Sequence, residues 1–367
     1  MKKFGSLISG IVIALFLGAF AFSRADLNDG FFIFYVRLAV AFALSFVLHI
    51  VIHEAGHLLF GLLSGYRFMS FRIASYLWQQ SPQGIRFYRF HIPGTSGQCL
   101  MLPPPITDDR FPFRLYNLGG SLTNLISVVL VLLINATIGD GRGSPYFIYI
   151  FAAIGVFLAL VNGIPMRVGM VANDGFNTRS LEKDSAALRA FWIQLAVHSE
   201  LIRGKRLAEM PEEWFRLPSP DQMDNPMQSY IATLRVQLLM DNGRLVEAKE
   251  LILWLLDNNY IKLELYQHLI RLDLIYLTLV LAEEPVQLEA ANTASAELFV
   301  KLMPNYPTVI RTQIVMALLV DRDEAAARQA EKKLTDLKPQ YPFPVEIEQE
   351  EKQIELAWQI YNAGKAK

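Results

Sequence analysis

The stretch FVLHIVIHEAGHLLF, residues 46–60, places one glutamate and three histidines inside an otherwise apolar run. Between Arg37 and Arg67 the only formally charged side chain is Glu54. An ionisable side chain is costly in a long apolar segment, and by default it marks a functional site. The stretch therefore predicts a helix in an apolar environment and a chemical reason for keeping a carboxylate within it.

The rest of the chain divides into two unlike halves. Up to about residue 176 the sequence contains long uncharged runs. From about residue 180 charge is dense, and no uncharged stretch reaches the roughly 18 residues that a membrane span requires. We predict a transmembrane domain at 1–178 and a water-soluble, all-helical interaction domain at 179–367.

Charge and cysteine content exclude several classes of function. The formal net charge of −1 argues against a nucleic-acid-binding protein, which would have a basic face. A single cysteine, Cys99, excludes an intramolecular disulfide, an iron–sulfur centre and a four-cysteine zinc site. Any bound metal must therefore be held by histidine and carboxylate groups.

Four apolar segments, at 4–22, 31–64, 115–139 and 146–166, are each long enough to cross roughly 30 Å of hydrocarbon as a helix. They predict an α-helical membrane protein with about four transmembrane helices. The first segment also fits a cleavable signal peptide, because two lysines precede it and small residues follow it. We favour a retained span.

The arginine distribution predicts the orientation of the chain. The loop at 65–114 contains six arginines and two aspartates, whereas the short connections at 23–30 and 140–145 carry one arginine each. Under the positive-inside rule the arginine-rich loop lies in the cytoplasm. We therefore expect an integral protein of a bacterial cell membrane whose C-terminal half is cytoplasmic.

Within that loop, YRFMSFRIASYLW (66–78) and GIRFYRFHIPG (84–94) have the aromatic and β-branched content of strands. They predict a small β element at the membrane surface within 65–101. An ordered amphipathic loop is the alternative.

The motif His53-Glu54-Ala55-Gly56-His57 predicts a metal site. On a helix the two histidines lie one turn apart on one face, so both can bind one ion while Glu54 takes a proton from a water bound there. His49, a turn earlier, is expected to be a hydrogen-bonded core histidine, although a role as a fourth ligand or as support for the ligands stays open. The alternative for the whole motif is a polar cluster that only joins helices.

A catalytic zinc usually has three protein ligands and a water, so one ligand is missing from this motif. The candidate is Asp174 in LVNGIPMRVGMVANDGF (160–176), because Pro165 ends or kinks the helix and Gly175 frees the backbone beside Asp174. An ordinary solvated Asp-Gly turn is the alternative. We predict one Zn²⁺ per chain, held by His53, His57 and Asp174, with Glu54 as the catalytic base.

Two further groups of residues are open to a structural explanation. In LGGSLTN (118–124) the small residues would let helices approach closely and Asn124 would offer a hydrogen bond between helices, so packing explains this stretch as well as a role at the site does. His91, His198 and His268 lie in polar sequence and are expected at the surface.

HEAGH in a span, GGSLTN opening a later span, and N-x-x-P followed by NDG at the end of the next resemble the site-2 protease family of intramembrane zinc metalloproteases over residues 45–177. The resemblance implies the same zinc ligands and base, with Asn162 as a candidate substrate-binding residue. Asn124 is a second candidate for substrate binding. It also implies that the loop at 65–101 pairs with substrate as an added strand. Asp174 follows Asn162 by twelve residues where many members have eight, which indicates a longer loop.

The C-terminal half predicts stacked helix pairs, with helices between proline and Asn-Gly breaks. NGRLVEAKELILWLL faintly resembles the second helix of a tetratricopeptide repeat, and DEAAARQAEKKLTDLKP does so more weakly. No 34-residue period persists, so we favour a repeat-like array over a plain bundle without assigning a true tetratricopeptide array. Its expected role is contact with a cytoplasmic protein partner.

These features predict a metalloendopeptidase that cuts a single-pass membrane protein or a signal-peptide-like remnant, either in regulated intramembrane proteolysis or in precursor processing. One alternative keeps the family but makes the metal site structural, which an intact Glu54 argues against. A second is a membrane-anchored helical-repeat adaptor without proteolytic activity. The adaptor would bind no zinc and would be indifferent to Glu54→Gln.

Overall fold

The computed structural model shows a mainly helical chain with one small antiparallel sheet. The predicted segment 4–22, and with it the choice between span and signal peptide, lies outside the described residues. The structure describes residues 31–92, 95–108, 110–138, 145–168, 171–182, 184–282 and 299–365.

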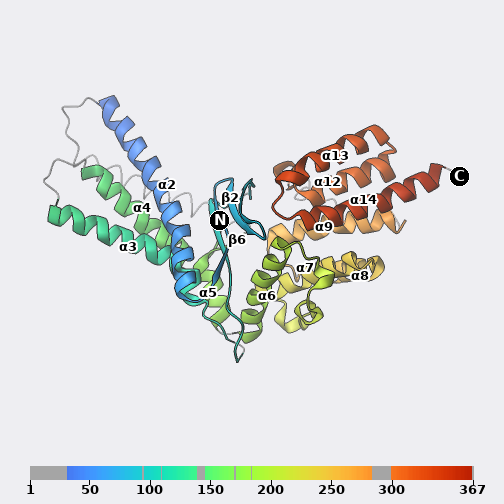
Figure 1. Cartoon of the computed structure of the whole chain (residues 1–367), viewed down its shortest axis with the longest axis horizontal. Coiled ribbons are helices and arrows are strands. Elements are labelled where there is room, and N and C mark those ends of the chain that lie inside the picture. Colours follow the sequence, from blue (N-terminus) through green and yellow to red (C-terminus); the bar gives the residue numbers. More distant parts are fainter. Residues whose placement is uncertain are drawn as a thin grey trace.

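Three apolar helices form one end of the molecule (Figure 1): α2 (Phe31–Leu63), α3 (Arg114–Ile138) and α4 (Pro145–Gly163). Apolar side chains such as Leu44 on α2 and Leu133 on α3 are more than half exposed, which is the pattern of a lipid-facing surface. By length and composition only α2 and α3 could cross a membrane among the described residues, because the apolar helix at Phe147–Gly163 is shorter. The expectation of four transmembrane helices is therefore not supported.

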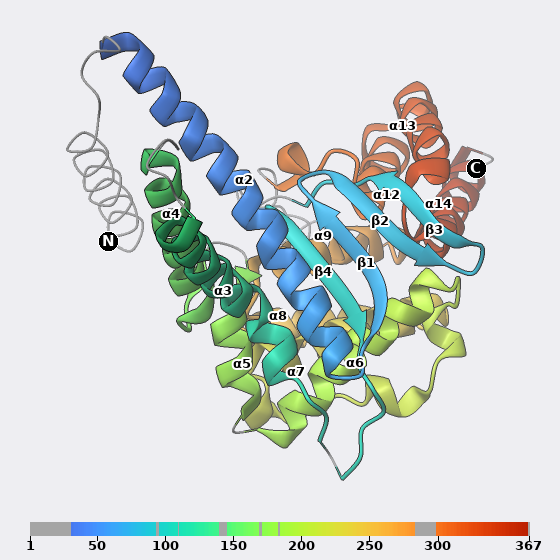
Figure 2. The same cartoon turned by 60° about the vertical axis from the view of Figure 1, so that its left-hand side comes forward.

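A four-stranded antiparallel sheet follows α2 and consists of β1 (Arg67–Ile73), β2 (Tyr76–Ser81), β3 (Gly84–Arg89) and β4 (Gly97–Leu102). The strand order is β3-β2-β1-β4, so β4 is an edge strand, and it runs beside α2 (Figure 2). The strand prediction is confirmed, but the stretch 66–78 forms two strands, because the chain turns at Ala74 with a φ of 51°. β4 lies outside the two stretches predicted as strands, although it begins within the predicted range 65–101.

The connection from α4 back to the site is a small hairpin of β5 (Arg167–Val168) and β6 (Val171–Ala172). It contains the residues that lengthen the interval between Asn162 and Asp174. Directly after it, α5 (Asp174–Glu182) begins at Asp174 and packs against α3 and α4. The predicted domain boundary at residue 178 falls within α5.

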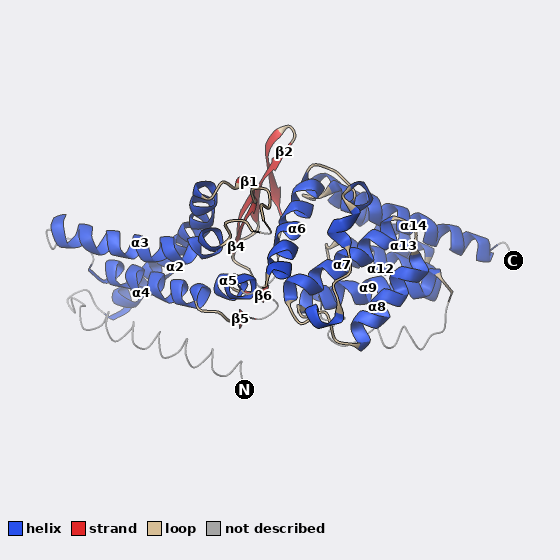
Figure 3. Ribbon diagram, turned by 90° about the horizontal axis from the view of Figure 1, so that it is seen from below, coloured by secondary structure: helices blue, strands red, loops and turns tan. Residues whose placement is uncertain are grey.

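The C-terminal half is all-helical, as predicted, and successive helices pack against one another (Figure 3). One helix ends at Asp241, before the Asn242-Gly243 break, and the next begins at Leu245, which confirms the prediction that helices lie between such breaks. The α-helices are α6 (Ser185–Ile202), α7 (Pro226–Asp241), α8 (Leu245–Asp257), α9 (Glu264–Val280), α12 (Pro307–Met316), α13 (Glu324–Leu337) and α14 (Pro344–Lys365). Shorter turns are the 3₁₀ segments Leu207–Glu209, Glu212–Phe215, Pro220–Gln222 and Lys338–Gln340, and a π turn at Ala317–Asp321.

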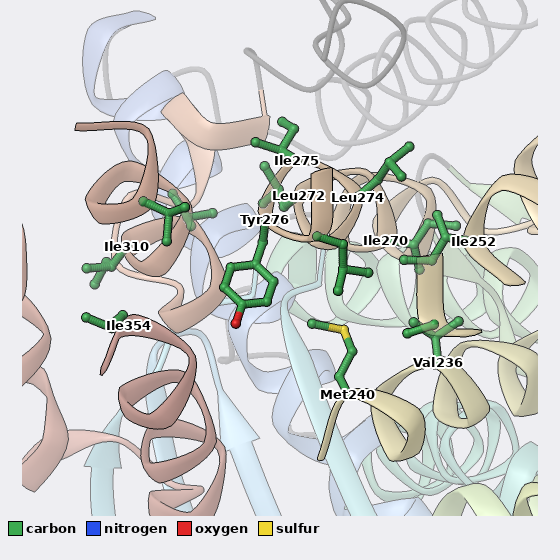
Figure 4. Close-up of a cluster of buried hydrophobic side chains, with 14 of the residues drawn as sticks. Val236, Met240, Ile252, Ile270, Leu272, Leu274, Ile275, Tyr276, Ile310 and Ile354 are labelled. Atoms are coloured by element: carbon green, nitrogen blue, oxygen red, sulfur yellow. The ribbon is translucent and has the colours of Figure 1, made fainter. Parts of the chain in front are cut away.

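The core of this half is built around α9, which packs between α8 and α12 (Figure 4). Because α9 has neighbours on several sides, residues 272–278 are all buried, including Tyr276. His268 lies in the same helix, is buried, and stacks on Phe299. Its predicted surface position is therefore wrong. His198 is partly buried beside Phe343, and His91 is exposed as predicted.

The two halves share a hydrophobic cluster. Met101 of β4 and Tyr116 of α3 belong to the same group of buried side chains as Phe191 of α6 and Tyr230 of α7. The indole of Trp192 also donates a hydrogen bond to the carbonyl of Pro104, at 2.9 Å. The start of α3 and the strand β4 thus pack directly against the C-terminal helices α6 and α7.

Candidate metal centre

Three side chains converge from two segments that are distant in sequence, the C-terminal part of α2 and the start of α5. Nε2 of His53 lies 3.2 Å from Nε2 of His57 and 3.1 Å from Oδ2 of Asp174, and Nε2 of His57 lies 3.4 Å from the same oxygen. Both histidines are buried in α2, and Asp174 is the first residue of α5. The three residues predicted from sequence to share an ion are therefore brought together.

The donor atoms have the chemistry and spacing of a zinc site. A tetrahedral ion with bonds of roughly 2.0–2.1 Å to nitrogen and oxygen holds its ligand atoms about 3.3 Å apart, which is close to the separations seen here. Two imidazoles and one carboxylate also leave a fourth position for water. Within the part of the chain that the structure describes, this is the only group of three or more His, Cys, Asp or Glu residues that could hold an ion.

Electrostatics favour the ionised form of the Asp174 ligand. Burial by itself raises the pKa of the Asp174 carboxyl, but positive charge on the His57 imidazole, when it is protonated, and hydrogen bonds from His53 and His57 outweigh this and lower the pKa well below its usual range. Asp174 is therefore a carboxylate, the form that binds a metal.

A backbone carbonyl determines which ring nitrogen of His57 carries the hydrogen. Its Nδ1 lies 2.7 Å from the carbonyl oxygen of Tyr116. A carbonyl oxygen only accepts hydrogen bonds, so Nδ1 carries the hydrogen and donates it. The Nε2 lone pair of neutral His57 consequently faces His53 and Asp174, as a metal ligand requires.

Close contact between α2 and α3 requires glycine at this level. A Cβ atom on Gly120 would lie about 2.5 Å from the imidazole of His53, and one on Gly56 would collide with the backbone of Gly119. The small residues of GGSLTN therefore allow the helix approach that the sequence predicted.

Asn173 holds the third ligand in place. Its amide nitrogen donates to the carbonyls of Val161 and Ile164, both at 2.6 Å, and its oxygen accepts from the backbone nitrogens of Met166 and Phe176. These bonds join the end of α4 to the start of α5, so Asp174 reaches the histidines despite the longer loop. The sequence analysis gave Asn173 no role, although asparagine directly before a helix is a known N-cap signal.

Glu54 lies beside the ligands and against the edge strand. Its side chain is 7% exposed, and a Cβ atom on Gly97 would overlap its carboxyl group. Gly97 is the first residue of β4, the strand next to α2 in Figure 2. The proposed base therefore lies where an edge strand meets the pair of histidines.

Arg72 of β1 holds the approach to β4, a role that the sequence analysis did not predict. The buried guanidinium donates to the carbonyls of Ala74 (2.6 Å) and Gly97 (3.3 Å) and to the hydroxyl of Thr95. Burial lowers the pKa of the Arg72 guanidinium, and attraction to Glu54 partly offsets that effect. Arg72 thus links the turn before β4 to the charge of the proposed base.

The remaining candidate residues have different surroundings. His49 is fully buried, lies outside the group of ligand atoms and hydrogen-bonds to Phe151 and Asn124, which confirms a hydrogen-bonded core histidine. Asn124 bridges α3 and α2, as predicted for a hydrogen bond between helices. Asn162 is half-buried and donates to the carbonyl of Leu158 in its own helix, so its role in substrate binding stays a prediction.

No family model, no curated protein and no solved structure matches this chain.

Proposed function

We propose that this protein is an intramembrane zinc metalloendopeptidase, similar to the site-2 proteases, that hydrolyses a peptide bond of a membrane-spanning substrate. The observation that carries the proposal is the convergence of His53, His57 and Asp174, with donor atoms 3.1–3.4 Å apart. Glu54 follows the first ligand within the same apolar helix. A site that only bound metal would need the ligands and no carboxylate base beside them.

The proposed placement in the membrane uses α2 and α3 as spans, α4 as a shorter third span and residues 4–22 as a fourth. The arginines of the 65–114 loop support an inner position for the sheet, and hence a cytoplasmic C-terminal half in a bacterial cell membrane. The exposed apolar side chains of α2 and α3 support contact with lipid.

The proposed chemistry is general-base hydrolysis. When bound by His53, His57 and Asp174, zinc would polarise the scissile carbonyl and lower the pKa of a water toward about 7. Glu54 accepts a proton from that water as its oxygen bonds to the carbonyl carbon. Glu54 then delivers the proton to the amide nitrogen as the C–N bond breaks, which releases an amine and a carboxylic acid.

The substrate must present an extended backbone. In an α-helix the carbonyl groups are hydrogen-bonded and shielded, so a helical span cannot be attacked until it unwinds. The edge strand β4 begins at Gly97, against Glu54, and supports pairing with an extended segment as an added strand. The expected substrate is a single-pass membrane protein or signal-peptide-like segment with helix-weakening residues near its cytoplasmic end.

The C-terminal helices are proposed to contact a cytoplasmic protein that delivers substrate or controls access. The observation that supports a link to the site is the hydrophobic cluster shared by β4, α3, α6 and α7. Nothing observed favours the adaptor alternative over the protease.

The test is the zinc content of detergent-purified protein by elemental mass spectrometry. We expect about one zinc per chain in the wild type and in Glu54→Gln, and little in His53→Ala or Asp174→Asn. The affinity for zinc depends on the side chains that bind the ion, and Glu54 is not one of them. His91→Ala is the matched control, since His91 is exposed and far from the ligand set in sequence. Folded wild-type protein that contains no zinc would overturn the proposal.

Catalysis is tested separately with a fluorogenic transmembrane peptide. Glu54→Gln should retain zinc yet lose about 10²–10⁴-fold in cleavage rate, the usual contribution of a general base. Equal cleavage by wild type and Glu54→Gln would contradict the assigned role of Glu54.

A further inference from the structure

A chain of buried polar groups extends from His53 away from the ligand atoms. Nδ1 of His53 lies 3.4 Å from the carboxamide atom of Asn124 placed as Nδ2, and the atom placed as Oδ1 lies 3.2 Å from Nδ1 of His49; the two atoms are exchanged by a half-turn of the side chain, and the hydrogen-bond partners favour the exchanged orientation. Nε2 of His49 lies 2.8 Å from the carbonyl oxygen of Phe151. The chain therefore joins α2, α3 and α4, and His49 and Asn124 are both fully buried.

The carbonyl at the far end determines the direction of every hydrogen bond in this chain. The Phe151 oxygen can only accept, so Nε2 of His49 carries the hydrogen and Nδ1 of neutral His49 must accept. The group that faces His49 is then the NH₂ of Asn124, which leaves the Asn124 oxygen facing His53. That oxygen accepts from Nδ1 of His53, so the lone pair of His53 lies on Nε2.

The opposite direction is excluded by physical cost. The two ends of a carboxamide have nearly the same shape, so a half-turn of the Asn124 side chain exchanges them and chemistry alone decides between the two orientations. With the oxygen toward His49, Nδ1 of His49 would carry the hydrogen and its Nε2 lone pair would face the Phe151 oxygen at 2.8 Å. A second proton on His49 would avoid this only by burying a cation between neutral groups, which is expensive.

We infer that His49 and Asn124 are positioning residues that hold His53 in the tautomer with hydrogen on Nδ1, so that its Nε2 presents a lone pair to the ion. The inference rests on the proposed zinc site. His57 reaches the same state through a single bond to the Tyr116 carbonyl, whereas His53 reaches it through two side chains.

This arrangement has a consequence for the site itself. With both tautomers set in this way, two Nε2 lone pairs and the Asp174 carboxylate oxygen face one another at 3.1–3.4 Å. Three acceptors at that spacing repel unless a positive charge, from a bound ion or from a proton on one of them, lies between them. The buried chain thus leaves the three acceptors oriented to share one ion.

The geometry around His49 also depends on glycine. A Cβ atom on Gly155 would overlap the His49 ring, so α4 approaches α2 closely enough for the Phe151 carbonyl to bond to His49 only because residue 155 lacks a side chain. The terminal acceptor of the chain is therefore held by helix packing.

The first test compares zinc dissociation constants by chelator competition in purified full-length protein. Asn124→Leu keeps a similar shape but removes both hydrogen bonds, and should weaken zinc binding by about 10–100-fold, the usual effect of losing a group that orients a metal ligand. Asn124→Asp keeps an oxygen toward His53 and should remain within a few-fold of wild type. Ser127→Ala, one turn along α3, removes a hydrogen bond to the backbone carbonyl of Asn124 but leaves the Asn124 carboxamide in place, so it should change nothing.

Two results would overturn the inference. One is wild-type affinity in Asn124→Leu, which would assign Asn124 to packing only. The other is an equal loss in Asn124→Asp and Asn124→Leu, which would show that the oxygen facing His53 is not what matters. If Asn124→Leu folds poorly, the tautomer of His49 in the wild type decides instead, because that measurement does not use the variant.

The second test does not depend on zinc. In zinc-free protein labelled with ¹⁵N-histidine, long-range proton–nitrogen correlations distinguish the two neutral tautomers, and the chain has only six histidines to assign. We expect His49 to carry its hydrogen on Nε2. Hydrogen on Nδ1 of His49 would reverse the chain and refute the inference. Absence of zinc in the wild type with His49 in the expected tautomer would instead refute the zinc site alone.

Discussion

At the scale of single residues, the site depends on what the neighbours of each ligand allow. Glu54 is tolerated in an apolar helix because it lies next to the ligand pair and is attracted to Arg72. His53 and His57 both present Nε2 because their Nδ1 atoms have partners on α3. The identity of the ligands could be read from the motif, but these partners come from segments distant in sequence.

Because His53 packs against Gly120, we predict that Gly120→Ala lowers the stability of the protein, although Gly→Ala in a helix usually raises it. Gly→Ala within a helix usually stabilises a protein by roughly 0.5–1 kcal/mol. Gly120→Ala should instead lower the melting temperature and weaken zinc binding, because its methyl group would overlap the His53 ring.

The control for this prediction is Gly364→Ala, which is also in a helix but whose Cβ atom would make only an ordinary contact, 3.7 Å from the Arg322 guanidinium. It should leave the melting temperature unchanged or raise it. Thermal unfolding of both full-length variants in detergent measures the effect. A Gly120→Ala protein as stable as Gly364→Ala would contradict the packing described at the site.

At the scale of elements, the sheet has two different faces. On one face Gln79 donates a hydrogen bond to the carbonyl of Pro342 and Leu77 is buried. On the other face Tyr76, Trp78 and Phe87 are exposed, and their rings contact one another across β2 and β3. Exposed Trp and Tyr side chains are enriched in membrane proteins at the lipid–water interface.

Under the proposed placement in a membrane, Trp78 should contact lipid. In vesicles that contain lipids brominated near the headgroup, we expect the fluorescence component that disappears in Trp78→Phe to be quenched. The remaining tryptophans serve as the internal reference, because Trp192 and Trp214 lie partly buried among the C-terminal helices. An unquenched Trp78 component would place this face of the sheet in water.

The C-terminal helices contain a buried ionic cluster. Arg311 of α12 is fully buried and lies 3.0 Å from Asp273 of α9 and 3.4 Å from Glu350 of α14. Its guanidinium also lies over the ring of Tyr276. Burial raises the pKa of both the Asp273 and Glu350 carboxyls, while Arg311 opposes that rise. The cluster ties three helices together through one cation.

Arg311→Met should destabilise the protein by about 3–5 kcal/mol, because it leaves two carboxylates buried without their cation. Arg328→Met removes a pair between Arg328 and Glu324 on the exposed surface and should cost less than about 1 kcal/mol. Chemical denaturation of the two variants, followed by circular dichroism, gives the comparison. Similar stabilities would mean that the buried cluster contributes no more than a surface pair.

At the scale of the whole molecule, the two halves meet at the sheet and at α6. Phe90, just after β3, packs against Tyr341 and Phe343, which precede α14. The hydroxyl of Tyr341 donates a hydrogen bond to Glu346 at 2.8 Å. Burial raises the pKa of the Glu346 carboxyl to about 7, against the effect of that hydrogen bond. The contact between the halves therefore contains a group that titrates near neutral pH.

The folded protein should lose stability as pH rises from about 4.5 to about 7. The Glu346 carboxyl gives up its proton more readily in the unfolded chain than in the folded one, so deprotonation favours unfolding across this window. The full effect is at most about 3 kcal/mol. Glu346→Gln should be more stable than wild type at pH 8 and gain nothing at pH 4.5.

Melting temperatures of wild type and Glu346→Gln at the two pH values measure this effect. The control is Glu348→Gln, on the exposed side of α14. A substitution at Gln353 of the same helix would not serve, because its side chain accepts a hydrogen bond from Arg311. A difference between wild type and Glu346→Gln that does not change with pH would contradict the assignment.

The amino-acid sequence by itself determined the apolar helices, the strand content of the loop, the α-helices of the C-terminal half and the identity of His53, Glu54 and His57. These are local properties, because hydrophobic runs, helical spacing and proline breaks act within one segment. For the same reason the sequence did not reveal that Gly97 begins an edge strand or that His268 is buried, since both depend on neighbours far along the chain.

The tertiary structure decided which groups meet. Asp174 reaches the histidines because Asn173 ties α4 to α5, and the tautomer of His53 depends on a carbonyl of α4 that lies 98 residues further along the chain, at Phe151. Hydrogen-bond direction and close helix approach arise only when separate segments pack, so no periodicity or motif within one segment contains them. The types of the candidate ligands are thus set by local sequence, and their convergence comes from packing.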